Sequence, residues 1–488
     1  MTAAMTPGDG TAITPRDRQS MWRTAGAEIV ALIIYVLAVE LLLRITDIKP
    51  KGGAAIVVSL VLAGIPALIW MAFFYAQDRT EPEPLRNVVL VAGAAGLLAV
   101  AVGQPMITKA FGVNEWITRS TWTQIIGSIL VIGFVQEFCK YFAIRSTVYE
   151  SDAINQRVDG VVYGAAAGVG YATALNVSTV LAVGGFLDLR AGVIRIVATA
   201  LTHGALGALV GYAVGRNRLE KRPAWALPLV LAAAAIVNGL SYWLRQRVSA
   251  RSISLTGQSG AQPARGLALQ CVIAVALLAA VLYFVRRADR QVIPVEERAK
   301  GNGGPLLAAV GLTAIALLLG LAQRNAVLGE TKTANALGAK VSYPATWRLS
   351  KSATEIQARY DGAGGYQTTL TLRSIKVDAE LTDVQAIAEA SNQLAVERGA
   401  DRTAFKVFDL STNRKLRGHA SATARYGFAA ERGTFLQESL PVVITGDDTY
   451  VRVGDTVQVM TLETPVSNRP AVTPRYRRFV SSIRFTKS

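Results

Sequence analysis

Long apolar stretches alternate with short polar connections along the first two thirds of the chain. Up to about residue 323, these stretches are rich in Ala, Val, Leu, Ile and Gly and nearly free of charge. Each has about 20 residues, the length that a helix needs to cross the hydrocarbon core of a bilayer. The pattern predicts an all-α polytopic membrane bundle of about nine transmembrane helices. The expected helices cover residues 25–45, 54–76, 88–108, 121–148, 159–183, 192–214, 224–244, 266–285 and 305–322.

The last third of the chain has a different pattern. Residues 335–488 mix charged, polar and β-branched residues, and about 150 residues are enough for a domain with its own core. Residues 366–377 alternate apolar and polar side chains as a half-buried strand does, and 381–398 show helical spacing with Thr382 or Asp383 as N-cap. This order of elements predicts a soluble α+β domain after the bundle. Further strands are expected at 404–411, 420–428, 433–445, 450–461 and 479–485.

Charge adds information about partners and orientation. The chain has 488 residues and a formal net charge of +17, but no patch of basic and aromatic residues accompanies this charge, so we expect no nucleic-acid partner. With a cytoplasmic N-terminus, most basic loop residues fall on the inner side, as the positive-inside rule requires. These residues are Arg145, Arg157, Arg216, Arg218, Lys221, Arg222, Arg286, Arg287, Arg290, Arg298 and Lys300.

This bias predicts a multi-pass protein of the cell membrane with a cytoplasmic N-terminus and, after nine crossings, an extracytoplasmic tail. Four arginines between residues 245 and 265 oppose the bias. The polar segment 1–24 lacks the apolar core of a signal peptide, so the first span is expected to direct insertion. Both cysteines, Cys139 and Cys271, lie in predicted spans, which leaves the tail without a thiol.

A few polar side chains interrupt the predicted spans. Glu137 and Lys140, in the stretch V-Q-E-F-C-K-Y-F at 135–142, stand three residues apart and therefore project from one helix face and can pair. A rise of about 1.5 Å per residue places His203, in the sixth predicted span, at the depth of Glu137. Charged groups at this depth cost at least about 2.5–3.5 kcal/mol and usually face an interior site. His203 is then either a metal ligand together with Glu137 or a hydrogen-bonded packing residue.

Motifs elsewhere in the bundle bear on which of these two roles His203 has. The stretch Y-A-Q-D-R-T-E-P-E-P at 75–84 follows the second predicted span, and its prolines prevent the helix from continuing. It is followed by V-Q-E-F-C-K, the glycine-rich residues 159–176, the histidine span 203–215 and A-A-I-V-N at 234–238. Together these motifs resemble the PrsW family of intramembrane metalloproteases over residues 25–245. Residues 246–330 then add two transmembrane helices and a linker.

The resemblance implies a hydrolase in which a zinc ion, held by residues of several helices, activates water. This chain departs from the family pattern at three positions, where Gln136 and Leu175 replace glutamates and Ala235 replaces a histidine. Leucine and alanine can neither ligate a metal nor transfer a proton. The departures therefore fall on the residues that the chemistry needs.

The residues that survive define the candidate site. The resemblance implies Glu137, Lys140 and His203 as catalytic residues, with Glu137 and His203 as an incomplete zinc site. Other polar residues at span positions are candidates to replace the missing ligands. They are Asn176, Asn238 and Glu28.

We therefore expect a catalytically impaired relative of these proteases, in which the buried cluster remains as fold and binding surface. Its partner would be the transmembrane helix of a regulatory protein, either cleaved or captured. The alternative is a non-enzymatic receptor or scaffold whose extracytoplasmic domain binds a protein or ligand. A third hypothesis, a small-solute transporter, is suggested only by the buried polar residues.

The tail carries a resemblance of its own. Its opening V-S-Y-P-A-T-W-R-L (341–349) and closing F-V-S-S-I-R-F (479–485) resemble PsbP/Mog1-like domains, which implies a binding module. His419, in the charged segment R-K-L-R-G-H-A, is expected to be an exposed side chain. The tail is therefore expected to dock an extracytoplasmic partner without chemistry of its own.

Overall fold

The chain forms two compact units in the computed structural model. The first comprises Met1–Val113 and Ser120–Ala322, and the second comprises Asn114–Arg119 and Gln323–Ser488. A short loop from the membrane region therefore belongs to the same unit as the tail. The structure describes residues 15–46, 53–77, 83–183, 189–250, 263–287, 303–361, 367–430 and 442–485.

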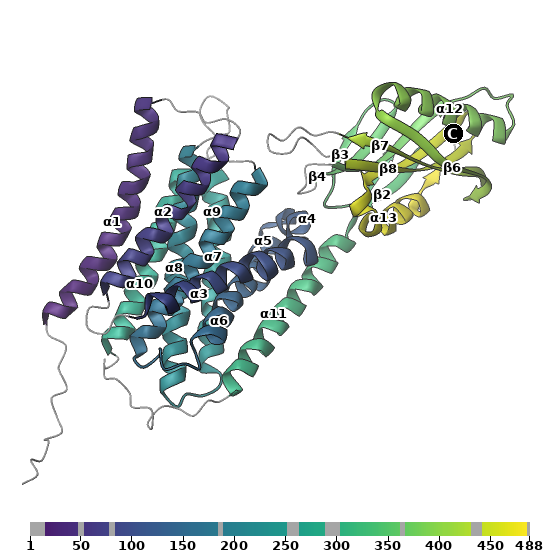
Figure 1. The fold of residues 1–488 in the computed structure, drawn as a ribbon. Coiled ribbons are helices and arrows are strands. Elements are labelled where there is room, and N and C mark those ends of the chain that lie inside the picture. The colour runs from purple at the N-terminus through teal and green to yellow at the C-terminus, as the bar shows by residue number, and fades with distance from the viewer. Residues whose placement is uncertain are drawn as a thin grey trace, which may run out of the picture. The chain divides into compact units, whose positions relative to one another are not determined.

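All of the predicted spans are helical (Figure 1). The third and fourth spans each contain π-helical segments. α3 (Leu85–Leu98) is followed by two of them, Ala99–Gly103 and Met106–Ala110, and then by the short α4 (Val113–Trp116). α5 (Thr121–Gly127) is joined to α6 (Phe134–Thr147) by the π-helical Ser128–Gly133.

The remaining helices of the bundle are α1 (Pro15–Thr46), α2 (Gly53–Gln77), α7 (Arg157–Val183), α8 (Leu189–Leu219), α9 (Ala226–Ala250), α10 (Pro263–Arg287) and α11 (Gly304–Gly329).

Within the described residues, eight helical stretches are long and apolar enough to cross a membrane, and α7 is not among them. Its packing explains its composition. α7 lies against α8 along a seam of glycines where the two backbones almost touch: a Cβ added to Gly164 would lie 2.2 Å from the Gly207 carbonyl oxygen. Close approach of this kind holds helices together in lipid. The facing positions along the seam are Gly160 with Gly211, Gly164 with Gly207, and Gly168 with His203.

Because partner numbers fall along α8 as they rise along α7, the two helices are antiparallel and cover the same depth. A helix enclosed in this way contributes small side chains rather than apolar bulk, which lowers its hydropathy. α7 is therefore a helix where the sequence predicted the fifth span, but it is not among the eight described stretches that are apolar enough to cross a membrane.

A second close contact fixes the helix that carries Glu137. α9 runs antiparallel to the segment around Gly133: a Cβ on Gly133 would lie 2.1 Å from the Ala235 carbonyl oxygen, and one on Gly239 would lie 2.5 Å from the Ile129 Cα. The π-helical turn Ser128–Gly133 ends one residue before α6, where the candidate site residues begin. Such turns are rare and are frequent at functional sites.

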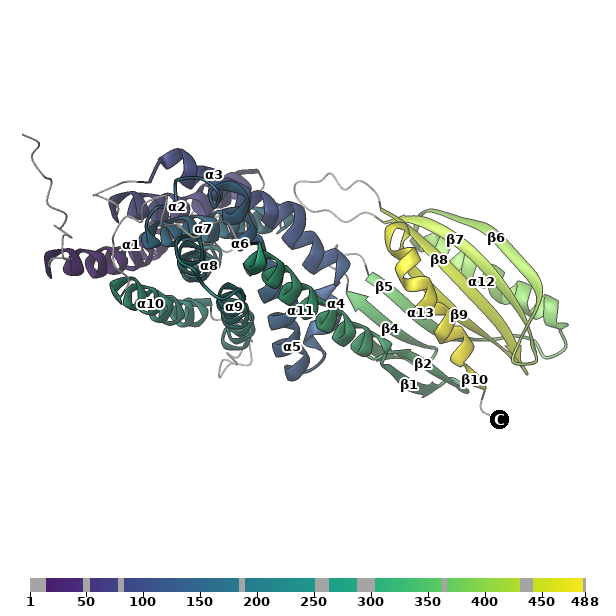
Figure 2. The same ribbon diagram turned by 90° about the horizontal axis from the view of Figure 1, so that it is seen from below.

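The tail contains two antiparallel sheets (Figure 2). The smaller has the order β1-β2-β10 and the larger the order β3-β4-β5-β9-β8-β7-β6. The strands are β1 (Thr331–Ala336), β2 (Ala339–Pro344), β3 (Arg348–Lys351), β4 (Glu355–Asp361), β5 (Gln367–Lys376), β6 (Thr403–Leu416), β7 (His419–Ala430), β8 (Val442–Val453), β9 (Thr456–Pro465) and β10 (Arg484–Phe485).

Two helices cover opposite faces of the large sheet. α12 (Asp383–Asp401) begins at Thr382, whose side chain forms a capping box with Gln385, and it packs Ile387 and Leu394 on one face. α13 (Arg469–Ser482) and the small sheet pack on the other face, around Tyr343, Trp347 and Phe479. The tail is therefore the α+β layered domain that the sequence predicted.

Three local predictions in the tail were wrong. The single strand expected at 450–461 is the end of β8, a tight turn and the start of β9, which pair as a hairpin. The strand expected at 479–485 is mostly the end of α13, because Phe479 and Ile483 are four residues apart and face the same core, a spacing that suits a helix as well as an alternating strand. His419 is only partly exposed, since its ring lies 5.0 Å from that of Phe485. The expected strand at 433–445 falls largely outside the described residues, which resume at Val442.

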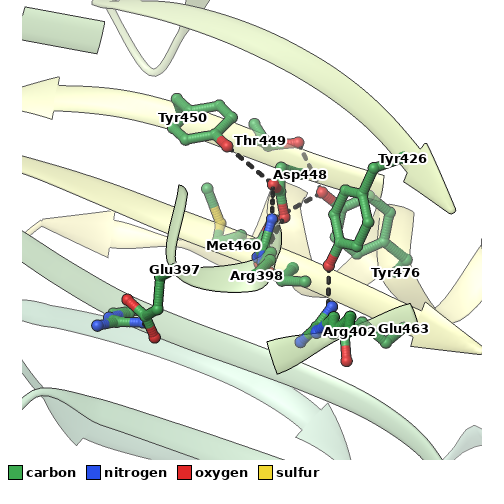
Figure 3. Close-up of polar contacts among 12 residues, drawn as sticks. Glu397, Arg398, Arg402, Tyr426, Asp448, Thr449, Tyr450, Met460, Glu463 and Tyr476 are labelled. Atoms are coloured by element: carbon green, nitrogen blue, oxygen red, sulfur yellow. Dashed lines mark hydrogen bonds and ion pairs between the residues drawn. The ribbon is translucent and has the colours of Figure 1, made fainter. Parts of the chain in front are cut away.

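A buried polar network joins α12 to the large sheet (Figure 3). Arg398 donates to both carboxylate oxygens of Asp448, at 2.6 and 3.2 Å, and the Asp448 side chain is 1 % exposed. Tyr450 and Thr461 also donate to Asp448, at 2.8 and 2.6 Å. Because each oxygen of Asp448 has partners, this network holds the fold together and offers no vacant ligand.

Candidate functional site

The candidate site is centred on Glu137 and Lys140, which form a buried ion pair on α6. The Lys140 Nζ donates to Glu137 Oε1 at 2.6 Å, and both side chains are 0 % exposed. One turn of helix brings residues three apart together, so the sequence spacing predicted this contact. Burial of two charges without water requires close pairing.

His203 reaches the same place from α8. Its Nδ1 lies 3.5 Å from the Lys140 Nζ, and the residue is 5 % exposed. The sequence argument therefore put Glu137 and His203 at the right depth, but the ammonium of Lys140 is the group that connects them. The ring of Tyr171 covers His203 at a centroid distance of 5.5 Å.

Asn238 of α9 closes the cluster from a third helix. Its Nδ2 donates to Glu137 Oε1 at 2.8 Å and to Gln136 Oε1 at 2.9 Å. Two members of the cluster, Gln136 and Asn238, are neutral amides, and both are buried. Gln136 thus acts as a hydrogen-bond acceptor where the family pattern has a carboxylate.

Two acceptor or donor atoms in this cluster lack a hydrogen-bond partner among the described residues: Glu137 Oε2 and the Tyr171 hydroxyl. Tyr171 was not singled out from the sequence, because one tyrosine in a Gly- and Ala-rich span gives no chemical signal. Its position depends on Gly103 at the end of a π-helical segment, where a Cβ would lie 2.4 Å from the Tyr171 hydroxyl oxygen. A buried polar atom without a partner often marks a functional position.

The remaining candidates lie elsewhere. Asn176 donates to the Ile196 carbonyl oxygen at 3.3 Å and so links α7 to α8. Leu175 packs in the apolar core of the bundle, and Ala235 is fully buried beside Phe134 and Ala316. The side chain of Glu28 falls outside the described part of the structure.

The donor set can be tested against the zinc ion that the family resemblance implies. A catalytic zinc site uses about three protein ligands. In the described part of the chain, no group of three or more His, Cys, Asp and Glu side chains is placed to hold a metal. Glu137 and His203 are the two donors of the right kind, and the Lys140 ammonium is hydrogen-bonded to the first and 3.5 Å from the second. Two donors are fewer than a catalytic zinc site uses, so these described residues do not fit a catalytic zinc on their own.

An apolar groove of about 390 Å³ lies on another face of α7. It runs between α2, α3 and α7, and Gly170 lines it while the next residue, Tyr171, contacts His203. Successive helix residues point about 100° apart, so Gly170 and Tyr171 face different directions from α7. Half of the other lining residues are alanine or glycine: Ala67, Ala92, Gly93, Gly96, Ala166 and Ala174.

These features define a multi-pass membrane protein with a buried acid–base cluster and a soluble α+β domain. Residues 82–240 match the family model described as PrsW family intramembrane metalloprotease. The match includes every residue of the polar cluster.

The similar proteins each cover between 32% and 38% of this chain. The protease PrsW of Geobacillus kaustophilus is 26% identical over 188 residues, which are 38% of this chain and 79% of that protein. Protease PrsW of Bacillus subtilis is 24% identical over 185 residues, 37% of this chain and 80% of the relative. The solution structure of cyanobacterial PsbP (CyanoP) from Synechocystis covers 32% of this chain and 92% of its own, with 11% identity and a TM-score of 0.25. The last likeness is to a protein of the type that the tail motifs resemble, but at this TM-score it supports no functional conclusion.

Proposed function

We propose that this chain is a catalytically impaired PrsW-like membrane protein that captures the transmembrane helix of a partner protein without cleaving it. The observation that carries the proposal is the donor set: Glu137 and His203 are the two residues of the cluster that could ligate zinc, and a catalytic site uses about three protein ligands. Leu175 and Ala235 add no ligand.

The groove between α2, α3 and α7 supports capture. Small residues let a helix backbone approach closely, and this is the main source of helix association in lipid. The glycine and alanine lining of the groove has this character. Gly170 lines the groove and Tyr171 contacts His203, so a helix bound in the groove meets a different face of α7 from the one at the acid–base cluster.

Metal content and cleavage test the proposal together. Purified full-length protein is expected to hold well below one equivalent of zinc and to leave a transmembrane peptide substrate intact, with Bacillus subtilis protease PrsW measured in parallel. Stoichiometric zinc that is lost in both Glu137→Ala and His203→Ala would contradict impairment. Cleavage that is abolished by Glu137→Gln but not by Asn176→Ala would contradict it independently.

Capture has its own readout. A tryptophan at Gly93, Gly93→Trp, fills the groove and is expected to abolish crosslinking to a partner helix, whereas Gly311→Trp on α11, where no atom lies within 4 Å of an added Cβ, is the matched control. Equal crosslinking in both variants would place the partner elsewhere.

The second candidate is a receptor or scaffold whose extracytoplasmic domain binds a protein or ligand. It is favoured by the compactness of the tail, which has its own cores on both faces of the large sheet. Accessibility of tail residues to a membrane-impermeant reagent in intact cells tests the orientation, and protection of the tail from the reagent would refute it.

A further inference from the structure

A hollow of about 170 Å³ opens between α8 and α9, away from the polar cluster. The two helices lie side by side in both views (Figures 1 and 2). The floor is apolar, formed by Leu209, Ala213, Leu227 and Val230, and the rim carries Arg216 and Arg222. The hollow therefore presents both apolar and positively charged side chains.

The rim arginines are held by one carboxylate. Arg216 Nη2 lies 2.9 Å and Arg222 Nη2 2.5 Å from Glu220 Oε2, while Arg157 Nε bonds Glu220 Oε1 at 2.6 Å. Glu220 orients both rim guanidinium groups, and its single negative charge balances one of these two positive charges. The Arg216 and Arg222 side chains remain 31% and 36% exposed, so their other N–H groups can reach a ligand.

The depth of the hollow is that of a membrane interface. It is lined by the last turns of α8 and the first turn of α9. A short connection joins these two candidate spans here, so their ends lie at the same side of the bundle. Trp225, at the start of α9, is 62% exposed, and Leu229 one turn later is 57% exposed. An exposed tryptophan followed by exposed leucine is typical of the boundary between headgroups and acyl chains.

We propose that this hollow binds an anionic phospholipid, with the phosphate at Arg216 and Arg222 and an acyl chain along Leu227 and Val230. Guanidinium groups bind phosphate oxygens in paired, charge-assisted hydrogen bonds. Basic pockets between membrane helices select anionic headgroups in this way. The ligand is a lipid rather than a free phosphate because most of the residues that line the hollow are apolar.

The test uses purified full-length protein in detergent with phosphatidylglycerol, phosphatidylcholine or inorganic phosphate added singly. Phosphatidylglycerol is expected to remain bound in native mass spectra and to raise the melting temperature, and the other two are not. The double variant Arg216→Gln/Arg222→Gln should reduce lipid retention at least about tenfold, since each lost charge-assisted bond is worth about that factor. Arg145→Gln/Arg218→Gln removes the same charge at the same end of the bundle outside the hollow and should retain the lipid.

A third variant separates the site from general charge. Ala226→Trp keeps both arginines but fills the hollow, and it should also lose the lipid. Full retention in Ala226→Trp, equal loss in the Arg145/Arg218 control, or equal binding of phosphatidylcholine would overturn the proposal. A melting shift produced by inorganic phosphate alone would show a free-anion site and overturn the lipid assignment.

Discussion

Lys140 Nζ lies 2.6 Å from Glu137 Oε1, and neither side chain is exposed to solvent or to the bundle surface. The pair comes from one helical turn, but its surroundings come from three other helices through His203, Tyr171 and Asn238. A charge pair enclosed in this way ties the chemistry of the site to the stability of the bundle.

The first prediction concerns this pair. Lys140→Met should cost about 3–5 kcal/mol of unfolding free energy, because it leaves the Glu137 carboxylate buried without its cation. The double variant Glu137→Gln/Lys140→Met should recover most of that loss. Unfolding in mixed micelles, followed by circular dichroism, gives both values, and the exposed Lys221→Met serves as control. A double variant less stable than Lys140→Met would show that the pair itself is not the source of the cost.

The glycine seam gives a second prediction. Gly207→Val should separate α7 from α8, because even a Cβ at this position meets the Gly164 carbonyl oxygen at 2.2 Å. Forced separation costs about 1–3 kcal/mol or more. The same substitution at Gly311, where an added Cβ meets nothing within 4 Å, should change stability little. Equal melting temperatures for the two variants would contradict the packing.

The tail network gives a third prediction (Figure 3). Asp448→Ala should destabilise the tail by about 3–5 kcal/mol, because Arg398 then stays buried without its partner. Glu397→Ala removes the exposed pair with Arg373 and should cost less than about 1 kcal/mol. Hydrogen exchange of β8 and β9 in the full chain measures both. Comparable losses of protection would mean that the buried position of Asp448 is not decisive.

The fourth prediction is a loss of tail stability in alkali. Burial, followed by the Asp448 carboxylate, raises the pKa of Tyr450 and of Tyr426 above the usual value. A folded pKa above the unfolded value of about 10 gives stability that is complete below that pH and declines as pH rises through it. The expected slope is about 1.4 kcal/mol per pH unit for each such tyrosine.

Subtilisin pulse proteolysis of the full chain between pH 8 and 11, with tail fragments identified by mass, follows this decline. Tyr450→Phe should be less stable at pH 8, because it loses the bond to Asp448, but should show a shallower slope above about pH 10. An unchanged slope would mean that Tyr450 ionises in the folded tail as it does in the unfolded chain.

Local spacing made the larger features predictable. The spans follow from apolar runs of fixed length, and the Glu137–Lys140 contact follows from three-residue spacing on one helix. Counting residues put His203 at the right depth but could not show which groups touch. Among the proposed substitute ligands, Asn238 joins the cluster and Asn176 does not, because helix rotation decides this and leaves no trace in hydropathy.

The parts that could not be predicted depend on contacts between distant segments. Tyr171 reaches His203 only because a π-helical segment leaves Gly103 beside its hydroxyl. The segment 479–485 has the alternation of a strand and the four-residue spacing of a helix, and packing against the sheet selected the helix. In each case tertiary contacts decided between two local conformations of similar cost.

The loop Asn114–Arg119 belongs to the same compact unit as the tail, where Glu115 pairs with Arg475 and Arg119 bonds Glu330. This unit is therefore built from two stretches of the chain, 114–119 and 323–488, that about two hundred residues separate. The two ion pairs join them, so a fragment that begins at residue 323 lacks the partners of Arg475 and Glu330 and should fold less stably than the same residues in the full chain.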